Sequence, residues 1–272
     1  MGIHPYTRYD RDSRMNRSRL LVLLLISGIL TSGCLQNTID SQANSSRPTY
    51  IIGIDAQYPP YSYMQSNGTP AGFDVESARW IADTMGFDVV IRPIAWDGII
   101  PALQAGKIDM IYSGMTITDE RKKQVNFTNS YWKVNQAVAI HNQNSYTLDD
   151  IYSGKLRIGA QRGTTGAIWV EKNLIDTGRM PPGSLVQYDL LPYAMDDLQT
   201  RRIDAVISST QSVMESIGTR DCHYIGDIET NELYGIAIRK GDIQLLNTMN
   251  EGLNLLMRSP EWELLKGKYQ MR

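Results

Sequence analysis

The chain has 272 residues, of which 42% are hydrophobic and 21% are charged, and its formal net charge at pH 7 is -2. This length and composition are typical of one large or two small globular domains and argue against a disordered chain. Because the chain has 27 basic and 29 acidic residues, it has no overall positive electrostatic field that would favour binding to nucleic acid or to an anionic surface. Local chemistry must therefore select whatever the protein binds.

An export signal is predicted within residues 1–34. The run "MNRSRLLVLLLISGILTSGC" begins at Met15 with two arginines, continues through an apolar stretch over 20–30, and ends in small residues before Cys34. That stretch is about half of the roughly 20 apolar residues that a membrane-spanning helix needs. We therefore interpret it as a signal with its true start at Met15, and residues 1–14 are left out of the fold prediction.

The small residues before Cys34 resemble the lipobox of secreted lipoproteins, in which the cysteine is lipidated and becomes the new N-terminus. Thr31 stands where that pattern usually has leucine, so plain secretion and an uncleaved anchor stay open as alternatives. The polar residues 35–48 are typical of a flexible tether. The folded body is expected from residue 49 onward, and its single cysteine, Cys222, leaves no internal disulfide to form.

Two segments of the body read alike. They are "LQAGKIDMIYSGMT" from Leu103 and "LQTRRIDAVISSTQ" from Leu198. In each, Leu-Gln ends a helical pattern, and the Ile-Asp-apolar run predicts a short buried strand of the kind found in parallel sheets. Upstream of each lies a β-branched strand and a loop, in "YIIGIDAQYPPYSY" and "LRIGAQRGTTGAIWV". The sequence therefore predicts two α/β lobes of similar plan.

The connections between these strands predict helices and a cleft. The stretches 73–86 and 167–178 are helical in period and end in glycine. In open α/β sheets, ligands bind beyond the carboxyl ends of strands, so two facing lobes bring their strand ends to one cleft. The strand-end residues are Tyr58, Ser113, Gly114, Thr164, Thr165, Ser208 and Ser209. Helix capping is the alternative role for any one of the hydroxyl residues.

Several longer stretches resemble a known family. The segments "GIDAQYPPYSY", "GFDVESA", "WDGIIPALQAGKIDMIYSGMTITDER", "GTTG" and "LYGIAIRKGD" are similar to those of bacterial extracellular solute-binding proteins of family 3, the polar amino-acid class that supplies ABC importers. The resemblance implies an α/β, two-lobed Venus-flytrap fold of type II, each lobe a mostly parallel sheet flanked by helices. It places lobe 1 at 49–135 plus 233–272 and lobe 2 at 136–232, with hinge crossings near "YWKVNQAVAI" and "NELYGIAI".

The resemblance also implies a carboxylate clamp. In that family, the arginine matching Arg121 forms a paired salt bridge with the ligand's α-carboxylate, which suits the two parallel donors of a guanidinium. Thr116 and the amides of the turn that holds Thr164 and Thr165 are implied to complete the anion's shell. Lys122 and Lys123 have no place in that pattern, and a solvated face is expected for them.

The rest of the ligand is expected to meet aromatic and acidic groups. Tyr58 and Trp96, which directly precedes an expected helix start at Asp97, are implied to enclose its carbon skeleton, while Tyr61 is equally compatible with core packing. Asp55 matches a position that meets the cationic side chain in relatives with basic ligands. A local turn or cap is the alternative role for Asp55.

One position departs from the amino-acid binders. Where they carry an aspartate that grips the α-ammonium group, this chain has Ser209, and a charge-assisted hydrogen bond is worth about 1.5 to 3 kcal/mol. Three explanations are open: Asp189 or Glu215 supplies the charge, the ammonium makes neutral bonds to Ser113, Thr116 and Ser209, or the ligand is a carboxylate without an α-amino group. We expect an amino acid, with a non-amino organic acid as the alternative.

An enzyme and a sensor are the alternative functions, and both have less support in the sequence. Dehydratases of the same fold that act on prephenate-like acids share the arginine, but catalysis needs a placed acid or base, and Glu215 is the only candidate. His141 and His223 lie in stretches that read as loops, so neither a nucleophilic relay nor a zinc site has support. A sensor would need a separate signalling partner. We expect a monomeric, lipid-anchored, extracytoplasmic binder that works with a membrane permease, without a metal, a cofactor or nucleic acid.

Overall fold

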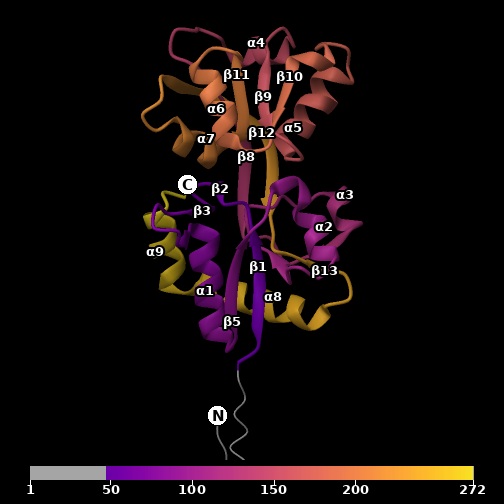
Figure 1. Cartoon of the computed structure of the whole chain (residues 1–272), viewed down its shortest axis with the longest axis vertical. Helices are drawn as coiled ribbons and strands as arrows, with labels where there is room; N and C mark the ends of the chain where they lie inside the picture. Colours follow the sequence, from indigo (N-terminus) through magenta and orange to yellow (C-terminus); the bar gives the residue numbers. More distant parts are fainter. Residues whose placement is uncertain (1–46, 272) are drawn as a thin grey trace, which may run out of the picture. The chain divides into compact units, whose positions relative to one another are not determined.

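The computed structural model describes residues 47–271, so the predicted signal, Cys34 and most of the tether lie outside the described residues. The described part contains two five-stranded sheets (Figure 1). The first has the order β5-β1-β6-β13-β7, in which β1 is parallel to β5 and β6 while β13 is antiparallel to β6 and β7. Its strands are β1 Thr49–Ile54, β5 Asp88–Pro93, β6 Met110–Ile111, β7 Val125–Phe127 and β13 Ala237–Arg239.

The second sheet repeats this plan. Its order is β10-β9-β11-β8-β12, with β9 parallel to β10 and β11, and β8 antiparallel to β11 and β12. Its strands are β8 Trp132–His141, β9 Ile158–Gln161, β10 Leu185–Tyr188, β11 Ala205–Ser209 and β12 Cys222–Tyr234. A small third sheet of β2 Gln57–Tyr58, β3 Ser62–Met64 and β4 Pro70–Ala71 follows β1.

Helices cover both large sheets. With the first sheet go α1 Phe73–Met85, α2 Ile99–Gln104, α3 Asp119–Lys122, α8 Ile243–Arg258 and α9 Pro260–Lys268; with the second go α4 Leu148–Tyr152, α5 Thr165–Val170, α6 Leu191–Gln199 and α7 Thr210–Ile217. Each sheet with its helices is called here the first or the second lobe. The predicted helix over 73–86 is confirmed as α1, which ends at Met85 and is capped by Gly86, a left-handed residue with φ 78°.

The strands bury alternate side chains on opposite faces. Along β6, Met110 belongs to the apolar cluster shared with α1 and α8, whereas Ile111 belongs to the cluster around α2. In β11, Val206 packs with α6 and Ile207 with α5. Both sheets are therefore covered on two faces, which explains why their strands read as continuous apolar runs.

The predicted internal repeat is confirmed. Helices α2 and α6 both end at the glutamine of the Leu-Gln pair, and β6 and β11 follow as strands parallel to β1 and β9. The isoleucine of each Ile-Asp pair fills the space above a glycine: a Cβ on Gly53 would lie 2.4 Å from Ile108 Cδ1, and one on Gly159 would lie 2.5 Å from Ile203 Cδ1.

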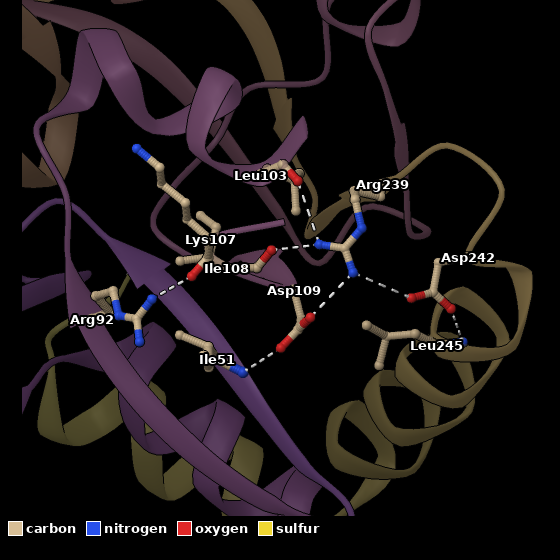
Figure 2. Close-up of polar contacts among 9 residues, drawn as sticks. All are labelled: Ile51, Arg92, Leu103, Lys107, Ile108, Asp109, Arg239, Asp242 and Leu245. Carbon is tan, nitrogen blue, oxygen red and sulfur yellow. Dashed lines mark hydrogen bonds and ion pairs between the residues drawn. The ribbon is translucent and has the colours of Figure 1, made fainter. Parts of the chain in front are cut away.

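The aspartate of each Ile-Asp pair has the same role in both lobes. Asp109 Oδ2 accepts the backbone N–H of Ile51 at 2.8 Å, and Asp204 Oδ2 accepts that of Arg157 at 2.8 Å. In the first lobe, Arg239 of β13 also donates to Asp109 Oδ1 at 3.1 Å (Figure 2). These bonds fix β1 to β6 and attach the C-terminal segment to the first sheet.

Two long strands connect the lobes. In Figure 1, β8 and β12 run side by side from the second sheet, to which they belong, toward the first sheet; they are paired from Cys222 opposite His141 to Tyr234 opposite Trp132. β8 begins at Trp132, shortly after β7, and β12 ends at Tyr234, shortly before β13. These connections to the first sheet lie in the stretches predicted as hinge crossings. The lobe boundaries after residues 135 and 232 fall inside these strands and stay a prediction.

The histidine environment differs from the sequence-based expectation. His141 is the last residue of β8 and is buried, and His223 lies within β12, so the interpretation of both as loop residues was wrong. Pairing with the neighbouring strand overrides the polar local sequence there. Within residues 47–271, no helix is long and apolar enough to cross a membrane.

Candidate functional site

A cavity lies between the carboxyl ends of the strands of the two lobes. It is lined by Asp55, Tyr58, Trp96, Gly114, Thr116, Arg121, Gln136, Gln161, Thr164, Thr165, Ser208, Ser209 and Tyr234. The structure thus brings together all of the residues predicted to contact a ligand except Ser113. Residues more than a hundred positions apart in the chain meet here because equivalent strand ends of the two lobes face one another.

Arg121 points into this cavity. Thr118 caps the short helix α3, with Oγ1 accepting the N–H of Arg121 at 3.1 Å, and the turn directs Arg121 inward while Lys122 and Lys123 are exposed. The Arg121 side chain donates from Nη1 to the Thr116 carbonyl at 2.9 Å and from Nη2 to the Gly163 carbonyl at 3.1 Å. The predicted solvated face at the two lysines is confirmed.

The charge of Arg121 is not neutralised by direct contact. Only 7% of its surface is exposed, and among the described residues it makes no ion pair. Burial lowers the pKa of the guanidinium, and the nearby charge of Glu232 opposes this. Its Cζ lies 5.4 Å from the centre of the Trp96 ring, over the ring face. A buried cation of this kind attracts an anion to the cavity.

Trp96 and the tyrosines form an aromatic wall. Trp96 is the first residue of a 3-10 turn, Trp96–Gly98, rather than the residue before a helix, and its Nε1 donates to the Gly163 carbonyl at 3.2 Å. Tyr58 donates its hydroxyl to Ser209 Oγ at 2.7 Å and lies 3.0 Å from the Tyr234 hydroxyl. Tyr61 stacks on Tyr58 from outside the cavity lining, with ring centres 5.2 Å apart.

Gly114 forms the floor at the end of β6. Its φ of +57° is left-handed, and a Cβ there would lie 2.8 Å from Tyr58 Cε1 and 3.1 Å from Tyr234 Cε2, so only glycine fits. Its N–H donates downward to Asp74 Oδ2 at 2.6 Å. Burial raises the pKa of Asp74 to about 8, although the bonds from Gly114 and Tyr131 oppose this.

Ser113 lies below this floor instead of in the lining. Its Oγ accepts the backbone N–H of Asp55 at 2.9 Å and lies 2.7 Å from Ser62 Oγ. Its hydroxyl therefore holds the loop after β1 in place. A direct contact between Ser113 and a ligand stays a prediction without support from the cavity lining.

The hydroxyl residues at the start of α5 divide into two roles. Thr164 Oγ1 accepts the N–H of Ala167 at 3.4 Å and donates to the Gln161 carbonyl at 2.7 Å, so it caps the helix. Thr165 Oγ1 donates to Glu232 Oε2 at 2.6 Å. Ser209 immediately precedes α7, but its side chain makes no capping bond, which leaves it directed to Tyr58.

Asp55 provides an acidic group from the loop after β1. It is buried, its Oδ1 accepts the N–H of Gln57 at 2.9 Å, and its Oδ2 accepts Gln161 Nε2 at 2.7 Å. Burial raises the pKa of Asp55, and the bonds from Gln161 and Gln57 lower it. Because both oxygens accept N–H donors, these bonds favour the ionised form.

Sequence reasoning missed four polar residues at the site. Gln136, Gln161 and Tyr234 line the cavity, and Glu232 binds side chains of the lining. Gln161 is the last residue of β9, so the strand-end rule would have found it. Gln136, Glu232 and Tyr234 lie on β8 and β12, whose approach to the cleft depends on the tertiary fold.

The acids proposed to replace the missing aspartate are not in the lining. The Asp189 carboxylate contacts Arg162 at 3.4 Å, and Glu215 borders a separate surface cavity. Across the described part of the chain, no group of three or more His, Cys, Asp or Glu side chains is arranged to hold a metal ion.

Comparison with known proteins identifies relatives along the whole body. The family model of bacterial extracellular solute-binding proteins, family 3, matches residues 50–272. An L-arginine-binding protein of Pseudomonas aeruginosa is 33% identical over 230 residues, which cover 80% of this chain and 86% of that protein. A probable histidine-binding protein of Neisseria gonorrhoeae is 27% identical over 252 residues, 90% of this chain and 92% of that protein.

Solved structures are similar over the same region. An ancestral arginine-binding protein bound to arginine has a TM-score of 0.75 and 34% identity, and the match covers 82% of this chain and 98% of that one.

Proposed function

Because the chain belongs to the bacterial extracellular solute-binding proteins of family 3, we propose that its cleft binds an amino acid through its α-carboxylate. The protein is an extracytoplasmic solute-binding component that serves an ABC importer. The observation that carries the ligand proposal is Arg121, a buried guanidinium that makes no ion pair within residues 47–271 and points into the cavity. A carboxylate is the anion whose two oxygens match its parallel donors.

The second part of the proposal is a cationic side chain on the ligand. Asp55 reaches the same cavity as Arg121 but from the loop after β1, and both of its oxygens accept donors. A ligand with a carboxylate for Arg121 and a cation for Asp55 neutralises both buried groups. The relatives named as arginine-binding and histidine-binding proteins support this class of ligand.

For the α-ammonium group, we propose neutral hydrogen bonds. Ser209 Oγ and the Tyr58 hydroxyl line the cavity, whereas the carboxylates of Asp189 and Glu215 do not. A hydroxyl oxygen accepts from an ammonium group without a charge of its own, so this half of the site binds less strongly than an aspartate would. A carboxylate ligand without an α-amino group remains the alternative.

Ligand entry requires motion. The cavity volume is about 20 Å³, which is room for about one water molecule. An amino acid therefore enters only when the lobes separate or the lining side chains move apart. We propose hinge motion at β8 and β12, with lobe 1 at 49–135 plus 233–272 and lobe 2 at 136–232. Anchoring through a lipid on Cys34, and a monomeric state, belong to the same proposal.

Catalysis is not part of this proposal. Glu215, the only catalytic acid that the sequence suggested, borders a different cavity from Arg121. The relatives compared above are named as binding proteins.

Calorimetric titration with four compounds tests the proposal. L-Arginine carries both the carboxylate and the cation, citrulline replaces the cation with a neutral group, agmatine lacks the carboxylate, and the desamino analogue of arginine lacks the α-ammonium. We expect arginine to bind more tightly than citrulline and agmatine not to bind. Equal binding of agmatine and arginine would exclude the Arg121 clamp, and tighter binding of the desamino analogue would favour the organic-acid alternative. Unchanged arginine after prolonged incubation is expected of a binder.

A further inference from the structure

The carboxylate of Glu232 receives three side-chain donors at one edge of the cavity. Thr116 Oγ1 donates to Oε2 at 2.7 Å, Thr165 Oγ1 donates to the same oxygen at 2.6 Å, and Gln136 Nε2 donates to Oε1 at 2.9 Å. The two threonine hydroxyls also lie 3.3 Å apart. One side chain thus holds three others together.

The donors come from different parts of the fold. Thr116 lies between β6 and α3 in the first lobe, Thr165 is the first residue of α5 in the second lobe, and Gln136 is on β8. Glu232 itself is on β12, beside the bridge that pairs Thr116 with Tyr234. The bonds to Glu232 therefore join both lobes to the two connecting strands.

This arrangement lies behind the wall of the cavity. Thr116, Thr165 and Gln136 all line the ligand cavity, whereas Glu232 does not. Glu232 lies in an adjoining surface groove that shares Thr116 and Thr165 with the cavity. The Glu232 carboxylate is therefore separated from the cavity by the two threonine hydroxyls that it binds. These bonds hold together the wall between the cavity and the groove.

Glu232 is distinct from the other contacts between the lobes. Tyr58 donates to Ser209, Tyr61 to Gln211 and Gln161 to Asp55, while Trp96 and Arg121 both donate to the Gly163 carbonyl. Lys172 and Glu120 form an exposed ion pair at 3.8 Å. At Glu232, a single carboxylate oxygen accepts a hydroxyl from each lobe. Bonds to a carboxylate are stronger than those between neutral groups, although partial exposure of Glu232 reduces the gain.

We propose that Glu232 is a positioning residue that latches the two lobes in the closed arrangement by accepting the hydroxyls of Thr116 and Thr165. The proposal rests on the proposed function, since a latch matters only where the cleft retains a ligand. The latch slows opening of the cleft, so it acts on the rate at which ligand leaves. It also directs the two hydroxyls and places a negative charge close to the Arg121 guanidinium.

A different role for the same carboxylate makes a different prediction. If Glu232 instead served as the counter-charge for the ligand's α-ammonium, in place of the aspartate that Ser209 replaces, its removal would harm only ligands that carry this group. The latch acts on the lobes and harms every ligand that the closed cleft retains. Arginine and its desamino analogue therefore separate the two roles.

The test uses Glu232→Ala and Glu232→Gln in the full chain. Alanine removes the acceptor. Glutamine keeps an oxygen for the two hydroxyls. Gln136, whose buried Oε1 has no partner among residues 47–271, can rotate its amide to accept from the new side chain. Glu229→Ala is the matched control because Glu229 is exposed on the same strand. Stopped-flow fluorescence measures association and dissociation of L-arginine and of its desamino analogue.

If Glu232 is a latch, its removal should lower ligand affinity by raising the dissociation rate. Glu232→Ala should raise Kd about tenfold or more for whichever of the two compounds binds, through faster dissociation, and Glu232→Gln should raise it by a smaller factor. Glu229→Ala should leave both rates unchanged. A loss confined to arginine, a loss located in the association rate, or no loss in Glu232→Ala would overturn the latch.

A second measurement tests the latch without any ligand. Hydrogen exchange of the ligand-free protein should be faster in Glu232→Ala than in Glu229→Ala over residues 114–118 and 163–168, while the strands of both sheets keep their protection. Equal exchange in the two variants would overturn the latch. Failure of the unaltered protein to bind any of the titrated compounds would instead count against the proposed function, and the exchange result would still decide the latch.

Discussion

The buried carboxyl of Asp74 predicts that stability falls as pH rises. Asp74 lies at the start of α1, where Oδ2 accepts the Gly114 N–H at 2.6 Å and the Tyr131 hydroxyl at 2.9 Å, while Oδ1 has no partner in the described part of the chain. Burial raises its pKa from 3.8 to about 8. Between these values the folded protein keeps a proton that the unfolded chain has lost, so stability is fully present below pH 4 and is lost progressively up to about pH 8.

The size of this effect follows from the shift. A group of this kind lowers the free energy of unfolding by about 1.4 kcal/mol per pH unit. From pH 5 to pH 7, Asp74 should therefore remove about 2.7 kcal/mol. Asp74→Asn has no proton to lose, so its stability should change less with pH than that of the unaltered protein by this amount.

Urea unfolding at pH 5, 6 and 7 measures the effect as a difference between slopes. The slope matters and not the absolute stability, because the asparagine amide also loses or gains hydrogen bonds. Asp83→Asn is the matched control, since Asp83 is on the same helix with 82% of its side chain exposed. Equal slopes for Asp74→Asn and the unaltered protein would show that Asp74 keeps no proton in the folded protein, and an equal change in slope for Asp83→Asn would show that the effect does not come from the buried site.

Three substitutions test other parts of the site. Gly114→Ala should lower ligand affinity about tenfold or more, because its Cβ displaces Tyr58 and its φ is strained; titration of a variant with unchanged affinity would contradict the close approach. Ser209→Asp should raise the affinity for an amino acid about tenfold by restoring a charge for the ammonium, and lower it for an acid without an amino group. Asp55→Asn should lower the affinity for arginine more than the affinity for citrulline. An equal loss of affinity for both compounds in calorimetry would exclude Asp55 as the partner of a cationic side chain.

Local sequence rules predicted the parts of the fold that depend on local order. The Leu-Gln and Ile-Asp repeat located two equivalent helix ends and strands, and the structure explains it: Ile108 and Ile203 pack over glycines, and Asp109 and Asp204 hold backbone N–H groups. Helix α1 was predicted because its apolar spacing and its C-terminal glycine agree. In these segments, short-range preference and long-range packing favour the same structure.

The gathering of the site residues was predicted less completely. The strand-end rule and the family resemblance indicated Arg121 and its neighbours, and the cavity brings most of those residues together. Glu232 could not be found in this way, because it lies on a connecting strand and meets Thr116 and Thr165 only when the lobes are together. Ser113 was predicted to contact the ligand, yet its hydroxyl forms hydrogen bonds with the Asp55 N–H and the Ser62 hydroxyl below the floor of the cavity. Such roles depend on side-chain directions that spacing along the chain does not determine.

A thermal-shift screen of Arg121→Ala beside the unaltered protein tests whether Arg121 clamps the carboxylate of an amino acid. An amino acid at 100 times its Kd adds about 2.7 kcal/mol, which raises the melting temperature by about 5 to 10 °C. We expect at least one amino acid to give this rise in the unaltered protein and in Lys122→Ala, a neighbouring exposed control, and none to give it in Arg121→Ala. Arg121 would not be the clamp if Arg121→Ala were stabilised as much as the unaltered protein, and the cleft would not be an amino-acid site if no amino acid stabilised the unaltered protein.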